Sequence, residues 1–246
     1  MRKTVRASLP AAVPGRAALV RRVVAPVLLA VAVLSPSAAG AQAWAYPAFQ
    51  PPRVMNREFN FGIADAGDAG TTLVFQWREG LTPRTQLSFD AGFADPDGRQ
   101  NGKLLLGIGF AGLLTQASTE MPLDFLATGG LNFAVGEGPD LVRIPFGVSI
   151  GHRFPLDEGF AITPYVHPRL SLDICTDCSG EENDDSDSDI GIDFDLGVNF
   201  EVTRQLSFRV SGMFGGSDAF RDSDGFGISL AWTPTGLSRF SRLIGR

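Results

Sequence analysis

Lysine is scarce in this chain of 246 residues, which contains only Lys3 and Lys103 and has a net charge of −6. Surfaces that bind nucleic acid need a basic footprint, so this composition excludes nucleic acid as a partner. After residue 43 there is also no run of about 18 apolar residues, the length that a membrane-spanning helix requires,. The chain therefore indicates neither a nucleic-acid-binding protein nor, beyond that point, a helical membrane protein.

Cysteine is equally rare, with one pair, Cys175 and Cys178, in the stretch CTDC. Two cysteines three residues apart on a loop form a local disulfide in an oxidising compartment, and we predict that bond here. Zinc prefers four ligands, and no second cysteine pair or nearby histidine completes such a site. A redox role would need a thioredoxin-like context, which the sequence lacks.

The N-terminus has the order of a secretory signal. Basic residues, beginning with Arg2 and Lys3, precede the apolar run Val23–Leu34, and small residues follow as far as Ala43. We expect export and cleavage near Ala43; an uncleaved anchor helix is the alternative. The predicted organisation is a signal peptide at 1–43, a proline-rich extended lead-in at 44–56, a β-barrel at 57–233 and a basic C-terminal tail at 234–246.

The rest of the chain alternates between apolar and polar residues with a period of two. In FDLGVNFEVTRQLSFRVSGMF, residues 194–214, large apolar side chains occupy every second position on both sides of a turn at VTRQ. This pattern predicts two antiparallel strands. Ten such segments follow one another with turn signals between them: 57–65, 71–79, 84–94, 103–116, 123–135, 141–154, 160–174, 189–202, 204–214 and 225–233. The predicted fold is all-β, an antiparallel up-and-down barrel of about ten strands, with eight possible and no helical domain.

The sizes of the side chains decide which face of this sheet points outward. Sixteen phenylalanines, with Trp77 and Trp232, fall on the apolar faces, whereas the opposite faces are rich in Gly, Ala and Ser. A barrel of eight to ten strands has an interior just wide enough for side chains, so it cannot hold that many rings. We therefore expect the rings to point outward into lipid, as in a transmembrane barrel. A secreted β-sandwich that buries the rings between two sheets is the alternative.

Charged residues then point into the lumen. Because an unpaired buried charge is costly, we expect them to form ion pairs that close the lumen, and an open pore is the alternative. The predicted network is Glu58, Arg78, Asp90, Asp124, Arg143, Arg153, His167, Arg169, Asp193, Asp195, Glu201 and Arg209, with Asp173 facing it. Pro145, Pro164 and Pro168 lie inside predicted strands and cannot donate to a ladder, so we expect interrupted pairing there.

Two further features could carry chemistry. Asp185, Asp187 and Asp189 match the first three ligand positions of a calcium loop, but Ile190 replaces the required glycine and the closing glutamate is missing,. A solvated acidic loop is the favoured interpretation, and Ca²⁺ binding is the alternative. His167 lies near carboxylates that could support acid–base catalysis, but no recognisable nucleophile motif accompanies it. We therefore predict no catalytic activity and no cofactor.

The alternation, the signal peptide, the hairpin FEVTRQLSFRVSG and the final strand GFGISLAW together resemble small bacterial outer-membrane β-barrels of the OmpA/OmpX type. The resemblance covers nearly all of residues 57–233. It implies the outer membrane of a Gram-negative-type bacterium as the location, with lipid and the barrel-assembly machinery as partners. A structural or surface-contact role is the expectation; the alternatives are a narrow ion or small-solute channel and a soluble exported ligand-binding domain.

Overall fold

The computed structural model describes residues 46–65, 70–95, 102–136, 140–156, 159–176, 187–217, 221–222 and 224–235. Ten long strands account for most of them: β1 (Arg57–Asp65), β2 (Thr71–Thr82), β3 (Thr85–Asp95), β4 (Lys103–Thr115), β5 (Asp124–Gly136), β6 (Asp140–Gly151), β8 (Ala161–Thr176), β9 (Asp187–Glu201), β10 (Leu206–Ser217) and β12 (Gly225–Trp232). Two short pieces, β7 (Phe154–Pro155) and β11 (Arg221–Asp222), pair antiparallel with β8 and β10, respectively. Within the described ranges, no helix has the length and apolarity to cross a membrane.

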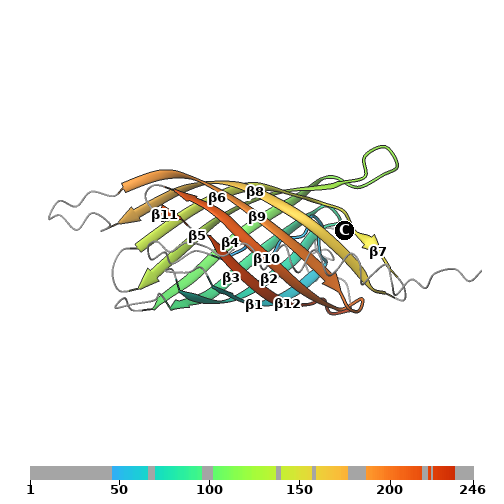
Figure 1. Ribbon diagram of the computed structural model, residues 1–246, viewed down its shortest axis with the longest axis horizontal. Helices are drawn as coiled ribbons and strands as arrows, with labels where there is room; N and C mark the ends of the chain where they lie inside the picture. The colour runs from blue at the N-terminus through green and yellow to red at the C-terminus, as the bar shows by residue number, and fades with distance from the viewer. Residues whose placement is uncertain are drawn as a thin grey trace, which may run out of the picture. The chain divides into compact units, whose positions relative to one another are not determined.

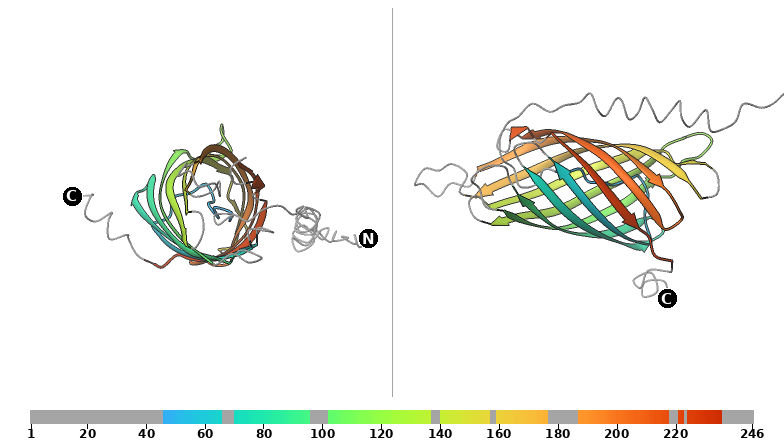
Figure 2. Two further views of the ribbon diagram at one scale, coloured as in Figure 1. Left: turned by 90° about the vertical axis from the view of Figure 1, so that its left-hand side faces the viewer. Right: turned by 60° about the horizontal axis from the view of Figure 1, so that its bottom comes forward.

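The ten strands close into a barrel (Figures 1 and 2). Each strand pairs antiparallel with its neighbour in sequence from β1 to β6, and then through β8 and β9 to β10 and β12. β12 returns to β1, where Phe59 lies opposite Trp232. The prediction of a ten-stranded antiparallel barrel is confirmed, because the ring has no unpaired edge between β12 and β1.

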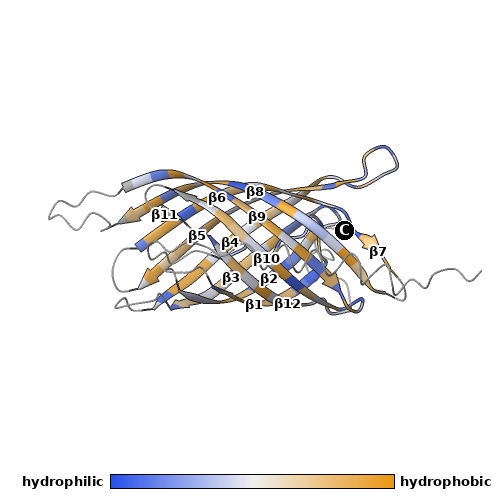
Figure 3. Ribbon diagram, viewed as in Figure 1, coloured by the Kyte–Doolittle hydropathy of each residue, from blue (hydrophilic) through white to orange (hydrophobic). Residues whose placement is uncertain are grey.

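The two faces of the sheet point as the side-chain sizes predict. None of the sixteen phenylalanines of the strand segments is buried, and Phe61 and Phe146 are 58% and 61% exposed. In contrast, Glu58 and Arg209 are both 0% exposed inside the barrel. Apolar colour accordingly alternates with polar colour along the strands (Figure 3). The β-sandwich alternative is wrong, because a sandwich would bury the rings and expose the charges.

The strand ladders are interrupted at the prolines, as expected for residues that have no backbone N–H to donate. Between β5 and β6, the ladder skips from the pair Gly129–Phe146 to the pair Asn132–Arg143, across Pro145. Between β6 and β8, it skips from Gly147–Arg169 to Ile150–Val166, across Pro168. Pro164 pairs with Val198 of β9 but lies beyond the last pair between β6 and β8.

The lead-in folds into the lumen. Residues 46–56 form no strand, and the part from Tyr46 to Met55, which we call the plug segment, lies inside the ring of strands (Figure 2, blue, left view). Its Phe49 is 0% exposed, unlike every phenylalanine of the strands. The sequence predicts an extended lead-in without placing it. The size of the lumen explains the location, since ten strands lined by small residues leave room that a peptide can fill.

A glycine inside the lumen gives a test of how tightly the wall is packed. Gly197 of β9 lies opposite Tyr165 of β8, and a Cβ atom at Gly197 would overlap the buried Tyr165 ring. We expect Gly197→Ala to lower the free energy of unfolding by about 1–3 kcal/mol, because overpacking forces the ring out of place. Urea unfolding in detergent micelles measures this loss.

Gly112→Ala in β4 is the matched control. The nearest atom to a Cβ at Gly112 is on the Phe110 ring at 3.9 Å, which is an ordinary contact. The control should therefore unfold like the parent protein. An equal loss in the two variants would show that the close approach of Tyr165 does not set the cost at Gly197.

Candidate functional site

The lumen of the barrel contains most of the predicted charge network. Nine of its residues are buried there: Glu58, Arg78, Arg143, His167, Arg169, Asp193, Asp195, Glu201 and Arg209. Asp90 also faces the lumen and is partly buried. They come from β1, β2, β3, β6, β8, β9 and β10, and closure of the ring arranges these strands around one lumen.

Glu58 lies at the centre of the first cluster, between two arginines. Its Oε1 accepts from Arg78 Nη1 at 2.6 Å, and its Oε2 accepts from Arg209 Nη2 at 2.6 Å. Arg209 Nε also donates to Asn199 Oδ1 at 2.9 Å. β1, β2 and β10 contribute the three charges, and they are neighbours only because β12 returns to β1. Three charge-assisted hydrogen bonds let this buried carboxylate stabilise two buried guanidinium groups,.

The second cluster joins β6, β8 and β9. Arg143 donates to both carboxylate oxygens of Asp173, at 2.7 and 2.8 Å, which is the bidentate geometry that arginine favours,. Arg169 Nη2 lies 3.0 Å from Asp195 Oδ1, and Asp193 Oδ2 lies 3.5 Å from Arg143 Nη1. Asp173, which faces the predicted network, is thus one of its principal acids.

A third cluster lies at one end of the barrel, which we call the turn end. Short connections join β2 to β3 and β9 to β10 at this end. Glu201 accepts from Arg153 and from Arg53 of the plug segment, each at 2.7 Å. The hydrogen bond to Glu201 raises the pKa of Arg153,. A depression of about 710 Å³ adjoins this cluster and is lined by Met55, Arg204 and Thr233, among others.

Asp124 lies outside this network. Its Oδ1 accepts from the backbone N–H of Ala117 at 2.8 Å, so it caps the connection between β4 and β5. It is the first residue of β5 and shares the inward face of Leu126, but it lies at the end of the strand. Lys103, which was not among the predicted lumen charges, is the first residue of β4 and is 4% exposed.

The plug segment supplies the contacts that sequence reasoning missed. Backbone carbonyls of Ala48 and Phe49 accept from Arg78 and Arg209 at 3.0 and 3.2 Å. The Tyr46 hydroxyl donates to Asp90 at 3.4 Å. Burial, and after it the charge of Asp90, raises the pKa of the Tyr46 hydroxyl well above its usual value,. A proline-rich stretch carries no period that would place it, so its aromatic residues were the only available signal.

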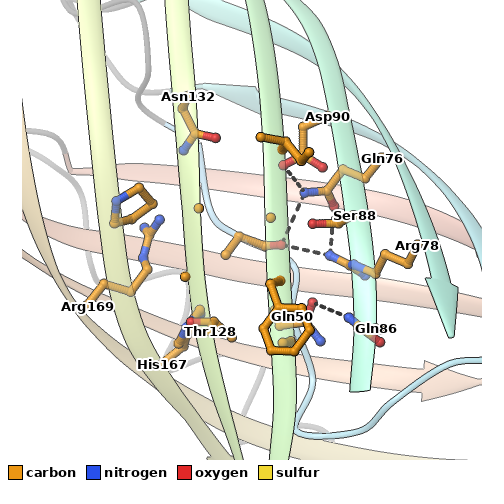
Figure 4. Close-up of a pocket in the computed structure, with 18 of the residues that line it drawn as sticks. Gln50, Gln76, Arg78, Gln86, Ser88, Asp90, Thr128, Asn132, His167 and Arg169 are labelled. Atoms are coloured by element: carbon orange, nitrogen blue, oxygen red, sulfur yellow. Dashed lines mark hydrogen bonds between the residues drawn. The ribbon is translucent and has the colours of Figure 1, made fainter. Parts of the chain in front are cut away.

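A polar cavity of about 90 Å³ remains between the plug segment and the wall formed by β4 and β5. Figure 4 shows Arg169, His167 and Thr128 on one side of it and Gln76, Arg78 and Gln86 on the other. Gly109 and Gly130 line the wall between them. A cavity of this size and polarity holds several water molecules, but it is too small for a drug-sized ligand.

One chain of contacts has the order of a hydroxyl, an imidazole and a carboxylate. Thr128 Oγ1 lies 2.8 Å from His167 Nε2, and His167 Nδ1 lies 3.4 Å from Asp195 Oδ2. Catalytic triads share this order, in which the carboxylate stabilises a charged imidazole. Here Asp195 also pairs with Arg169 at 3.0 Å, and that guanidinium opposes a second positive charge beside it,. We therefore interpret these contacts as a structural link between β5, β8 and β9 along one side of the lumen.

The two loop predictions fall largely outside the described residues. Cys175 is disulfide-bonded, and the only other cysteine of the sequence, Cys178, lies outside them. Asp185 and the side chain of Asp187 also lie outside them. The Asp189 carboxylate accepts from the N–H of Ile190 at 2.7 Å. Among the described residues, no group of three or more acidic, histidine or cysteine side chains is arranged to hold a metal ion.

Comparison with known proteins assigns no family to this chain. No protein-family model matches the sequence, and no curated protein matches it.

Proposed function

We propose that this protein is an integral outer-membrane β-barrel of a Gram-negative-type envelope, with a closed lumen and a structural or surface-contact role. The observation that carries the proposal is the exposed apolar belt around the whole barrel. Large side chains are exposed on its strands, including Phe61, Leu73, Phe146 and Ile192 at 55–64%. Soluble monomers rarely expose contiguous apolar patches of more than a few hundred Å², and lipid is the solvent that such a belt requires.

Closure of the sheet supports the same proposal. A membrane-spanning sheet must satisfy every backbone group internally, because each unsatisfied group costs several kcal/mol in hydrocarbon. The ring from β1 to β12 leaves no open edge, and its long strands, from 8 to 16 residues, bracket the roughly 9–11 residues that a tilted strand needs to cross a bilayer,. The sequence of this chain resembles OmpA/OmpX-type barrels, and we propose that the protein is a barrel of that type.

Aromatic residues at the turn end support a membrane boundary there. Trp77 and Trp232 lie on either side of Phe59, with ring centroids 6.4 and 5.7 Å from it. The indole N–H of Trp77 donates to Glu79, which pairs with Arg57 at 2.7 Å on the same outer face. Tryptophan rings beside charged groups are typical of the level of the lipid headgroups. The turn end would then be the periplasmic side, where the plug segment ends and β1 begins.

The filled lumen argues for a closed barrel. Ion pairs join adjacent or next-but-one strands around the inner wall, and the plug segment occupies the space that this wall encloses. This arrangement favours a structural or surface-contact role over the alternative of a narrow channel. We propose no catalytic activity and no cofactor, with lipid and the barrel-assembly machinery as partners.

Fractionation and bilayer recording test this proposal. The protein should be found in the outer-membrane fraction, and its unboiled form should migrate differently from the boiled form in detergent gels. Reconstituted in a planar bilayer, it should give no single-channel steps. Recovery from the soluble periplasm would contradict the membrane location, whereas regular conductance steps would favour the channel alternative.

A further inference from the structure

The plug segment is held in the lumen as a bound peptide would be. Three successive carbonyls accept hydrogen bonds from the barrel: Ala48 from Arg78 at 3.0 Å, Phe49 from Arg209 at 3.2 Å and Gln50 from Ser149 at 2.6 Å. The three donors are 2% exposed or less and come from β2, β10 and β6. The barrel therefore binds the main chain of the segment from several directions.

One side chain anchors the segment. The Phe49 ring packs against Gly62 of β1 and Gly227 of β12, where an added Cβ would lie 3.0 and 2.6 Å from the ring. Any residue larger than glycine would therefore reduce the space for the ring. The φ angle of Phe49 is +48°, a left-handed conformation that an aromatic residue adopts only when its surroundings impose it,. The barrel thus has a glycine-lined pocket for an aromatic ring, beside a row of donors that bind main-chain carbonyls.

The wall residues alone do not fill this lumen. Its lining includes Gly107, Gly109, Gly130 and Ser88, all small, and a cavity of about 90 Å³ persists even with the segment in place. Withdrawal of ten residues would join that cavity to the space that the segment leaves. Because the surrounding walls carry charges and amides, water would occupy this space.

We propose that the lumen is a binding site for an extended peptide, that Tyr46–Met55 is its resident ligand, and that release of this ligand converts the closed barrel into a water-filled channel. The channel part rests on the proposed membrane function. The peptide-binding part does not, since it follows from contacts inside the barrel. The site selects an aromatic side chain at the position of Phe49 and binds the flanking main chain independently of sequence.

Cutting the covalent link after folding tests the binding site on the full chain. A protease recognition sequence inserted after Asn56, which is exposed, lets the barrel fold with the segment attached. After cleavage in detergent, the fragment should remain bound through gel filtration and dissociate in moderate urea before the barrel unfolds. A fluorescent peptide of residues 46–55 should then rebind to the emptied barrel, and its failure to bind would overturn the proposal.

Two peptide variants separate specific recognition from general adhesion. The Phe49→Ala peptide should bind about a hundredfold more weakly, because it leaves the pocket at Gly62 and Gly227 empty,. The Val54→Ala peptide is the control, since Val54 is only partly buried and should change binding by less than about threefold,. Equal affinities for both variants would show that the site does not recognise Phe49.

Planar-bilayer recording tests the channel, with a second variant that needs no cleavage. The cleaved barrel should conduct once the fragment is removed, and added peptide should close it again. In the intact chain, Gly227→Ala should cause intermittent opening, because the added Cβ displaces the Phe49 ring. Peptide binding without conductance in an inserted barrel would refute the channel and leave the binding site. Binding by a barrel that never inserts would instead refute the membrane function.

Discussion

Replacing Glu58 with glutamine is expected to lower the free energy of unfolding by about 3–5 kcal/mol, the usual cost of removing one partner from a buried ion pair. Glu58 is 0% exposed and lies 2.6 Å from both Arg78 and Arg209, which are themselves 2% and 0% exposed. A neutral amide leaves two guanidinium groups facing each other without a counter-charge. Urea or guanidinium unfolding in detergent micelles measures the loss, with the parent protein as reference.

Glu201→Gln is the matched control for this prediction. Glu201 also pairs with two arginines, but 42% of the Arg53 side chain and 39% of the Arg153 side chain are exposed. Water can solvate those guanidinium groups, so the control should lose about 1 kcal/mol or less. The double variant Glu58→Gln with Arg209→Gln should recover part of the loss, because it removes one of the unpaired charges. Similar losses at Glu58 and Glu201 would refute the role assigned to burial.

Replacing Phe61 with arginine should cost about 2–4 kcal/mol in the stability of the barrel in lipid, the penalty for arginine near the bilayer midplane. Phe61 is the central residue of β1, points outward and is 58% exposed. If its surroundings are water, an exposed arginine costs little; if they are acyl chains, the charge must be desolvated. Equilibrium folding into lipid vesicles, followed by urea titration, distinguishes the two cases.

Two controls isolate the cost of the charge. Phe61→Leu removes the ring contact with Phe75, whose centroid lies 5.0 Å away, and should cost about 0.5–1.5 kcal/mol,. Val202→Arg places the same charge beyond the end of β9, at the turn end, and should cost about 0–1 kcal/mol,. If Phe61→Arg were as stable as Phe61→Leu, the outer face would be in contact with water and the membrane proposal would fail.

The bounds of the strands could be predicted from the sequence, because alternation with the neighbouring residues assigns each side chain to one face of the sheet. β1 has the predicted bounds, and β12 ends one residue earlier than predicted. The larger differences have local causes. β6 ends at Gly151 because the next residue of the partner strand is Pro164, which has no N–H to donate,. β10 begins at Leu206 because the Thr203 hydroxyl accepts from the N–H groups of Gln205 and Leu206 and holds a turn there,.

The partner of each charged residue in the lumen could not be predicted from this alternation. Arg209 and Glu58 are 151 residues apart, and they meet only because the last strand pairs with the first. Each arginine had several carboxylates on inward positions, and alternation does not choose among them. Asp124 has the inward parity of the buried Leu126, but it lies at the end of β5, where its carboxylate accepts from the backbone N–H of Ala117.

By itself, the sequence determined which residues face outward and which face inward, since a period of two assigns every second side chain to the same face of a strand. Only the tertiary structure decided what fills the interior. The volume of the lumen depends on the number of strands and on all the side chains around one cross-section, which come from every part of the chain. Phe49 shows the difference: it lies in a segment without periodicity, and only the closed ring with its glycines at positions 62 and 227 creates the space that holds it.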